Sequence, residues 1–451
     1  MLNVVKFGFA ASCLLASLPA SAQTANNLTV LKGLEPVAAL PNTPEGDAAL
    51  AANFAVTGGV QTGAIRQPTL LPLAEQRQQA LKDAFITGGN DAELTDGLGT
   101  TLGSAYLARA HYLDQKHFTS VSPALADLIA YTNVTSGSDA NAGKYFFANE
   151  TTDGKAPVSD DAAAVMRDHS GVTDVFGKAY GHPAGGVGAD IYGDSRPFQT
   201  EPTVAPITGP DYFNAPSDNA VYLRGPIMNL IDSPSFPSGH STYGYSGALL
   251  LAILIPERYQ QMVVRGAEYG NDRILIGAHY AMDVLGGRAV AAYDVAHLLA
   301  NDPAYVGQSL KHAPVIADYP AALKAAKADL IAVLQASCGD TVATCARADT
   351  GRFNDPARNE AFYAVTQTYG LPVVHPETAG AVEDVGKLAH DAGYLLTAAF
   401  PWLTLDQADQ ILTETEGPGG GFLDNGSSFG VYSRLNLYAA AGLAAQRAAA
   451  K

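Results

Sequence analysis

The sequence predicts an all-α protein, and three observations lead to this prediction. Apolar residues recur at helical spacing in several segments, the first of them at 73–86 and 102–113. The alternation of apolar and polar residues that is typical of strands is scarce. The chain has 451 residues, 47% of them hydrophobic and 16% charged, which is enough to bury a large core and excludes a disordered protein.

The segment 1–22 has the pattern of a secretory signal peptide. Lys6 gives a positive start, 7–18 form a short apolar stretch, and Ala20-Ser21-Ala22 is a small-residue cleavage site. The apolar stretch is shorter than the about 20 residues that span a bilayer, so a membrane anchor is the weaker interpretation. We therefore expect the mature chain, 23–451, to be periplasmic or secreted.

The three cysteines predict one disulfide. Removal of the signal peptide would remove Cys13 and leave Cys338 and Cys345. In an oxidising compartment two nearby cysteines most simply pair with each other, and we expect a structural bridge that takes no part in activity.

The mature chain is expected to have three parts. An irregular N-terminal arm at 23–70 is rich in Asn, Thr, Gly and Pro, a core follows at 71–305, and a helical extension at 306–451 ends the chain. Within the core, 181–237 is rich in Gly and Pro and is expected to be a long loop region, which in a compact protein is usually functional or disordered. Further helices are expected at 122–132, 160–169, 239–255, 279–300, 319–336, 357–369 and 405–414. We expect no membrane-spanning segment in the mature chain.

The overall charge excludes one class of function and constrains another. The net charge of −17 argues against a nucleic-acid-binding protein, which needs a basic surface. The same charge repels anionic substrates unless a local cluster of cations overrides it.

Three short stretches carry residues that are suited to phosphate chemistry. They are Arg196-Pro197 in the loop region, Pro237-Ser238-Gly239-His240 at the start of an apolar helix, and Arg273 followed by His279 and Asp283. On a helix, His279 and Asp283 would share one face, so that the carboxylate fixes the ring tautomer and leaves the other ring nitrogen free as a nucleophile or ligand. Arg273 offers a planar set of donors to phosphate oxygens. Backbone N–H groups at the start of the apolar helix favour an anion, and His240 can act as a general acid.

Each stretch alone has a simpler explanation. A His and an Asp at helical spacing are more often a surface pair, and Pro-Ser-Gly before a helix is usually a turn and cap. Their occurrence together, in this order and around one apolar helix, favours a common site.

These residues resemble the tripartite signature of the PAP2 superfamily, which includes bacterial class A non-specific acid phosphatases, phosphatidate phosphatases and vanadium-dependent haloperoxidases. The resemblance covers about 178–300 and implies a helical bundle of the same kind. By this resemblance His279 attacks phosphorus and forms a phosphohistidine, Asp283 orients it, and His240 protonates the leaving oxygen and then activates water. The phosphate oxygens would be held by Arg196, Arg273, Ser238 and the backbone of Gly239. No metal ion or other cofactor is expected.

Two positions depart from the family pattern. The family has a lysine before the arginine of its first motif, at a position where this chain has Ala189. Lys178 is the nearest lysine that could replace it, and we expect it to bind phosphate. The family commonly has serine before the arginine of its third motif, where this chain has Asp272. This residue would either pair with Arg273 and orient it, or lower the positive charge of the pocket.

The resemblance leaves several functions open. The leading one is an exported, metal-independent acid phosphatase that hydrolyses small phosphomonoesters and works at acid pH, because His240 must be protonated. One alternative is a vanadium-dependent haloperoxidase, in which the same pocket binds vanadate and His279 ligates the vanadium. Another is a phosphatidate or other lipid phosphatase of the same superfamily. A phosphate-binding protein with a degenerate site is the non-enzymatic alternative.

Overall fold

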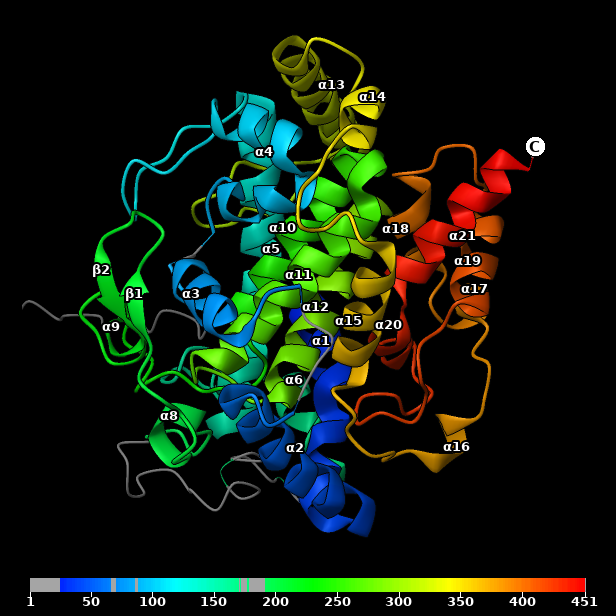
Figure 1. Ribbon diagram of the computed structural model, residues 1–451. Coiled ribbons are helices and arrows are strands. Elements are labelled where there is room, and N and C mark those ends of the chain that lie inside the picture. The colour runs from blue at the N-terminus through cyan, green and yellow to red at the C-terminus, as the bar shows by residue number, and fades with distance from the viewer. Residues whose placement is uncertain are drawn as a thin grey trace, which may run out of the picture.

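The computed structural model describes residues 25–65, 70–85, 88–169, 171, 177 and 191–450, and this part of the chain is mostly helical, as predicted (Figure 1). The expected signal peptide, Lys178 and Ala189 lie outside the described residues. No helix within the described ranges combines the length and the apolar character that crossing a membrane requires.

Four helices form the centre of the molecule. They are α5 (Pro123–Asn149), α10 (Gly239–Leu254), α11 (Tyr259–Leu275) and α12 (Ala281–Leu299), and they pack against one another (Figure 1). α10 is buried on nearly all sides, which is the expected position for a helix that is apolar all round. The ring of Tyr269 on α11 lies against Gly244 of α10, where a larger side chain would collide with it.

The N-terminal arm is helical, which corrects the expectation of an irregular segment at 23–70. Its described part contains α1 (Ala25–Leu34), the 3₁₀ helix η1 (Glu35–Asn42) and α2 (Pro44–Thr62). Pro36 and Pro44 do not oppose these helices, because each stands in the first turn, where a backbone N–H is not needed. α1 also packs against α5, and this burial stabilises it.

Several helices of the core differ from their predicted ranges. α4 (Thr100–Leu107) ends before the expected 113, and α6 (Asp160–Ala164) ends before the expected 169. α5 continues to Asn149, well beyond the expected end at 132, and α12 begins at Ala281 instead of 279. α11 is absent from the predicted helices. The Ser, Thr, Asn and Gly residues of α5 and the glycines of α11 have low helix propensity, and packing against neighbouring helices outweighs these local preferences.

The described part of the predicted loop region, 191–237, is largely irregular. It contains two short helices and a small antiparallel hairpin at one side of the molecule (Figure 1). These elements are α8 (Pro197–Thr200), β1 (Thr208–Pro210), β2 (Pro216–Asp218) and α9 (Asn219–Leu223).

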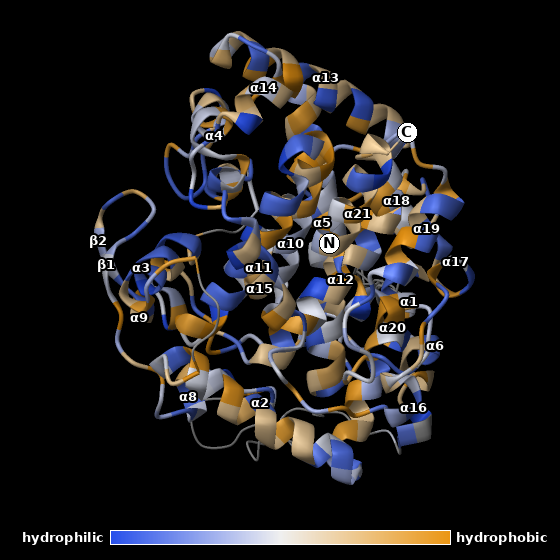
Figure 2. Cartoon of the chain, turned by 45° about the vertical axis from the view of Figure 1, so that its right-hand side comes forward, coloured by the Kyte–Doolittle hydropathy of each residue, from blue (hydrophilic) through white to orange (hydrophobic). Residues whose placement is uncertain are grey.

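The remaining described helices cover the central bundle. Before the loop region they are α3 (Leu73–Asp83), η2 (Ala92–Leu98), α4 (Thr100–Leu107), α6 (Asp160–Ala164) and η3 (Arg167–His169). After the loop region they are η4 (Pro256–Arg258), α13 (Tyr319–Cys338), α14 (Val342–Arg347), α15 (Pro356–Thr368), α16 (Pro376–Ala379), α17 (Val385–Leu388), η5 (His390–Gly393), α18 (Tyr394–Thr397), α19 (Leu405–Glu414), α20 (Gly430–Arg434) and α21 (Leu437–Ala449). α13 carries hydrophobic and hydrophilic residues together (Figure 2), and it buries Leu323, Leu330 and Leu334 on one face.

The C-terminal extension packs directly on the central bundle. Arg288 of α12 lies between the rings of Tyr245 and Tyr363, 4.6 Å from the centroid of the second ring. Its guanidinium also donates to the backbone oxygens of Thr366 and Leu435. A single buried cation therefore connects α12 with two segments of the extension.

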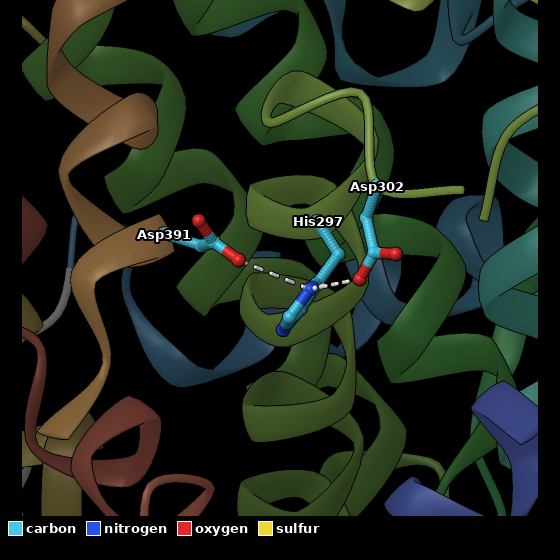
Figure 3. Close-up of side chains that lie close together, drawn as sticks. All are labelled: His297, Asp302 and Asp391. Atoms are coloured by element: carbon cyan, nitrogen blue, oxygen red, sulfur yellow. Dashed lines mark hydrogen bonds and ion pairs between the residues drawn. The ribbon is translucent and has the colours of Figure 1, made fainter. Parts of the chain in front are cut away.

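A histidine at the end of α12 provides a second connection to the extension. Nδ1 of His297 lies 2.8 Å from a carboxylate oxygen of Asp302 and 3.4 Å from one of Asp391, which belongs to η5 (Figure 3). Within the extension, Cys338 and Cys345 form the predicted disulfide, which joins α13 to the short helix that follows it.

Candidate active site

The structure brings the predicted residues together around the start of α10. Arg196 precedes α8, Arg273 stands in the last turn of α11, and His279 lies just before α12. All three side chains are fully buried, and charge interactions connect them with His240 and Asp283. A cluster of cations is therefore enclosed in a chain whose net charge is −17.

The two ring nitrogens of His279 face groups of opposite charge. Nδ1 lies 3.3 Å from Oδ2 of Asp283, and Nε2 lies 3.0 Å from Nη1 of Arg196. Because a guanidinium can only donate, Nε2 is the unprotonated nitrogen, and the ring proton is on Nδ1, where it points to Asp283. Nε2 therefore carries the lone pair that a nucleophile needs.

Asp283 is positioned by the first turn of α12. Its carboxylate accepts hydrogen bonds from the N–H of Tyr280, at 2.8 Å, and from the hydroxyl of Ser235. Asp283 and His279 meet, as predicted, but they do not lie on one helix face, because His279 precedes the helix and Asp283 reaches back over its N-terminus. Burial raises the pKa of Asp283 to about 6, although the hydrogen bonds from Ser235 and Tyr280 oppose this shift.

Arg196 is held in place by backbone oxygens. Its guanidinium donates to the carbonyl oxygens of Ser233, Pro234 and Ala278, at 2.8, 2.9 and 3.1 Å. These hydrogen bonds fix the guanidinium beside His279 without cancelling its charge. Burial lowers the pKa of Arg196 only to about 10, so the side chain remains charged at neutral pH.

Arg273 differs from Arg196 in its partners. Its guanidinium is fully buried, and none of the three nitrogens forms a hydrogen bond within the described residues. A buried cation without a partner is costly unless an anion joins it. Its N–H groups are therefore free to bind an anion placed between Arg273 and His279.

The start of α10 adds backbone donors and a second histidine. The hydroxyl of Ser238 caps the helix by accepting from the N–H of Ser241 at 3.1 Å. The N–H groups of Gly239 and His240 are the first of the helix and have no acceptor inside it. In the described part of the chain, Nε2 of His240 forms no hydrogen bond. These donors and the ring all belong to the first turn.

Two further residues hold the loop before α10 and were not assigned a role from the sequence. Asp194 accepts a hydrogen bond from the N–H of Phe236 at 2.8 Å. Gly287 of α12 gives room to the backbone oxygen of Ser238, since a methyl group at Gly287 would lie 2.5 Å from that oxygen. Their roles depend on contacts between distant segments, which no local pattern reveals.

The comparison with known families agrees with this arrangement. Residues 183–303 match the PAP2 superfamily, and all three motifs lie within this range. The chain carries a PAP2 superfamily domain.

The relatives of this PAP2 domain match over a shorter stretch. The chain is 47% identical to a non-specific acid phosphatase of Salmonella typhimurium over 64 residues, which cover 14% of this chain and 26% of that protein. It is 45% identical to an acid phosphatase of Zymomonas mobilis over 64 residues, which cover 14% and 24%. A lipid A 1-phosphatase of Rhizobium johnstonii is 32% identical over 84 residues, which cover 19% and 33%. The chain therefore spans about a quarter to a third of the length of these relatives.

A lysine that sequence reasoning missed lies in the site of the PAP2 domain. Lys144 of α5 is 5% exposed, and a methyl group built on Gly239 would lie 3.3 Å from its Nζ. It lies outside the matched range and in the part of α5 that is not predicted to be helical, so no sequence signal could have placed it here. Lys178, the predicted phosphate ligand, is outside the described residues, and its role stays a prediction.

The second departure from the PAP2 pattern, Asp272, does not face Arg273 as an ion pair. Burial, followed by the negative charges of Asp83 and Glu268, raises the pKa of Asp272 well above its ordinary value. The neutral carboxyl is therefore favoured, and Asp272 does not remove positive charge from the pocket.

Proposed function

We propose that the PAP2 domain of this chain hydrolyses phosphomonoesters with His279 as the nucleophile. The observation that carries the proposal is the buried Arg273, whose guanidinium has no hydrogen-bond partner within the described residues. Burial, followed by the charges of Arg196, Lys144 and Arg273, lowers the pKa of the nearby His279. A phosphate group supplies the acceptors that such a site needs. The similarity to acid phosphatases of two bacteria supports the same chemistry.

The first step would transfer the phosphoryl group to the protein. Nε2 of His279 attacks phosphorus, the bond from phosphorus to the alcohol oxygen breaks, and this oxygen takes a proton from His240. Asp283 accepts the hydrogen bond from Nδ1 of His279 and stabilises the positive charge that develops on the ring. Arg196 would move its hydrogen bond from Nε2 to a phosphate oxygen as the new bond forms.

The second step would regenerate the site. Water attacks phosphorus, the bond to Nε2 of His279 breaks, and His240 accepts the proton that water loses. Phosphate leaves, and His240 is protonated again. Positioning and charge stabilisation supply the catalysis in both steps, and neither step uses a metal ion.

The electrostatics of His240 support activity at acid pH. Burial, followed by the charge of Arg273, lowers the pKa of His240 well below its ordinary value. The ring is therefore neutral near pH 7 in the absence of a ligand, while the first step needs it protonated. Acid pH and the negative charge of a bound phosphate both favour the protonated ring. We therefore propose an acid phosphatase, exported by the signal peptide at 1–22.

Hydrolysis of p-nitrophenyl phosphate by the purified protein, from acid to neutral pH, tests this proposal. We expect turnover that falls toward neutral pH, resists EDTA and is inhibited by vanadate. His279→Ala should remove turnover and keep phosphate binding. Phosphate binding without turnover in the unaltered protein would instead indicate a binding protein, and halide-dependent peroxidase activity after loading with vanadate would indicate a haloperoxidase.

A second candidate substrate is a phosphate group on a lipid. The similarity to the lipid A 1-phosphatase of Rhizobium johnstonii favours this candidate. The site chemistry would be the same, and only the leaving group would differ. A higher kcat/KM for a phosphorylated lipid in detergent micelles than for p-nitrophenyl phosphate would identify the lipid as the better substrate.

A further inference from the structure

We propose that Lys144 of α5 binds the phosphate group of the substrate and replaces the lysine that the PAP2 pattern places at position 189. This inference rests on the phosphatase function proposed above. It adds a ligand from a helix outside the residues that match the superfamily, 183–303. The pocket would thus obtain the same charge from a different element of the fold.

The amine of Lys144 lies beside the first N–H groups of α10. A methyl group built on Gly239 would be 3.3 Å from Nζ and 3.5 Å from Cε of Lys144. Because that methyl position and the amide nitrogen are attached to the same Cα, the Gly239 amide and the Lys144 amine border the same space. An anion held by the amide would therefore also contact the amine.

Lys144 has no partner among the described residues that would explain a structural role. Its side chain is 5% exposed, and among the described residues its amine forms no hydrogen bond and no salt bridge. Lys327 shows the usual arrangement, because its amine donates to the backbone oxygen of Ile253 at 3.1 Å. A buried ammonium without an acceptor destabilises a fold, which is typical of a group that is retained for binding.

A glycine next to Lys144 allows α5 to approach the loop. A methyl group at Gly143 would lie 3.0 Å from Cδ of Pro237 and 3.1 Å from Cδ1 of Leu34. Any larger residue would push α5 away from the start of α10. Lys144 follows directly in the chain, so the same close approach sets its side chain beside Gly239.

The surrounding charges couple the protonation of Lys144 to anion binding. Burial, followed by the positive charge of Arg196, lowers the pKa of Lys144 to about 7. A bound phosphate dianion would raise it again, because an opposite charge favours the ammonium form. The charged or titratable groups that face Lys144 are Arg196, Arg273, Asp194, Asp283, His240 and His279.

Binding of inorganic phosphate to three methionine variants, measured by calorimetry, tests the inference. Lys144→Met removes the amine and keeps an unbranched side chain, Lys327→Met is a control at a partly buried lysine outside the site, and Lys178→Met tests the alternative lysine. We expect Lys144→Met to weaken phosphate binding about 10- to 100-fold, the usual effect of losing a hydrogen bond to a charged group, and to raise KM in parallel. Lys327→Met should bind phosphate like the unaltered protein. If phosphate binding is weaker in Lys178→Met and unchanged in Lys144→Met, the proposal is overturned.

Thermal unfolding separates a binding role from a structural one. Because the amine has no acceptor within the described residues, Lys144→Met is expected to unfold at the same temperature as the unaltered protein or higher. A lower unfolding temperature together with unchanged phosphate affinity would overturn the proposal. If Lys144→Met does not fold, Lys144→Arg is used in its place. Because a guanidinium stays protonated, the sulfate affinity of Lys144→Arg should fall less steeply with rising pH than that of the unaltered protein. An equal dependence on pH in the two proteins would overturn the proposal.

Phosphate binding by the unaltered protein separates failure of the proposed function from failure of the role given to Lys144. If it binds no phosphate, the proposed function and this inference fail together. If it binds phosphate and Lys144→Met binds it equally well, only the inference fails.

Discussion

Nε2 of His279 accepts a hydrogen bond of 3.0 Å from Arg196. This contact fixes the tautomer of the ring and keeps a positive charge next to it. Burial, followed by the charge of Arg196, lowers the pKa of His279 well below its ordinary value, so the ring stays neutral down to acid pH. These electrostatics are compatible with the proposed function, in which a neutral His279 attacks phosphorus at acid pH.

The first prediction concerns Asp283, whose carboxylate faces Nδ1 of His279. Asp283→Asn removes the carboxylate that stabilises the positive charge developing on the His279 ring, and the amide can donate to Nδ1, which competes with the tautomer that Arg196 favours. We expect kcat for p-nitrophenyl phosphate to fall about 10²- to 10⁴-fold, as in hydrolases whose orienting aspartate is changed to asparagine. KM should change little, because the phosphate ligands remain.

A matched control exists outside the site. Asp302→Asn alters a carboxylate that lies 2.8 Å from Nδ1 of His297, at the far end of α12. This variant should keep the kcat of the unaltered protein. Equal kcat values for Asp283→Asn and Asp302→Asn would contradict the role given to Asp283.

The second prediction concerns protons that accompany anion binding. Burial and neighbouring cations lower the pKa of His240 well below its ordinary value and that of Lys144 to about 7, so the empty site holds few protons at neutral pH. A dianion raises both pKa values, and binding must therefore take up protons. Sulfate affinity should fall as pH rises from about 6 to about 8, by about tenfold per pH unit for each proton taken up.

Calorimetry in two buffers of different ionisation enthalpy measures this uptake directly. Sulfate is used because it does not titrate in this range. His240→Gln should lower the number of protons taken up and leave the fold intact. Sulfate affinity that is independent of both pH and buffer would contradict the prediction.

The positions of the proposed catalytic residues could be predicted from the sequence because these residues occur in short motifs. The cap at Ser238, the histidine that follows it and the spacing from Arg273 to Asp283 are local signals, and the structure places them around one point. Even here the local geometry differs, because His279 precedes α12 instead of lying within it.

The position of Lys144 in the site could not be predicted from the sequence, because it depends on tertiary packing. Lys144 reaches the site only because α5 continues through a segment rich in Ser, Thr, Asn and Gly, which has low helix propensity. Packing against α10 and α12 stabilises this segment. The helical N-terminal arm has the same origin, since α1 packs against α5.

Two buried carboxyl groups, Asp139 of α5 and Asp294 of α12, interact away from the proposed catalytic residues. Burial raises the pKa of Asp139 to about 7, and burial together with the charge of Asp139 raises the pKa of Asp294 well above its ordinary value. The native state therefore holds protons that the unfolded chain, with an ordinary aspartate pKa of about 3.9, releases. The contribution of Asp139 to stability is complete below about pH 4 and is lost as the pH rises toward about 7, and the contribution of Asp294 falls in the same direction.

Asp294→Asn is the third prediction, and its effect on stability should depend on pH. The native carboxyl at pH 8 must either keep a proton that the unfolded chain releases or carry a buried charge, whereas the amide is neutral in both states and can donate a hydrogen bond to Asp139. We therefore expect the free energy of unfolding to rise by about 1–3 kcal/mol near pH 8. Near pH 4 the native carboxyl is already neutral, and the variant should match the unaltered protein. Urea denaturation at both pH values measures the difference.

Asp329→Asn, at an exposed position of α13, makes the same change in net charge and should have little effect at either pH. Equal stabilisation by Asp294→Asn at both pH values would contradict a protonated native pair.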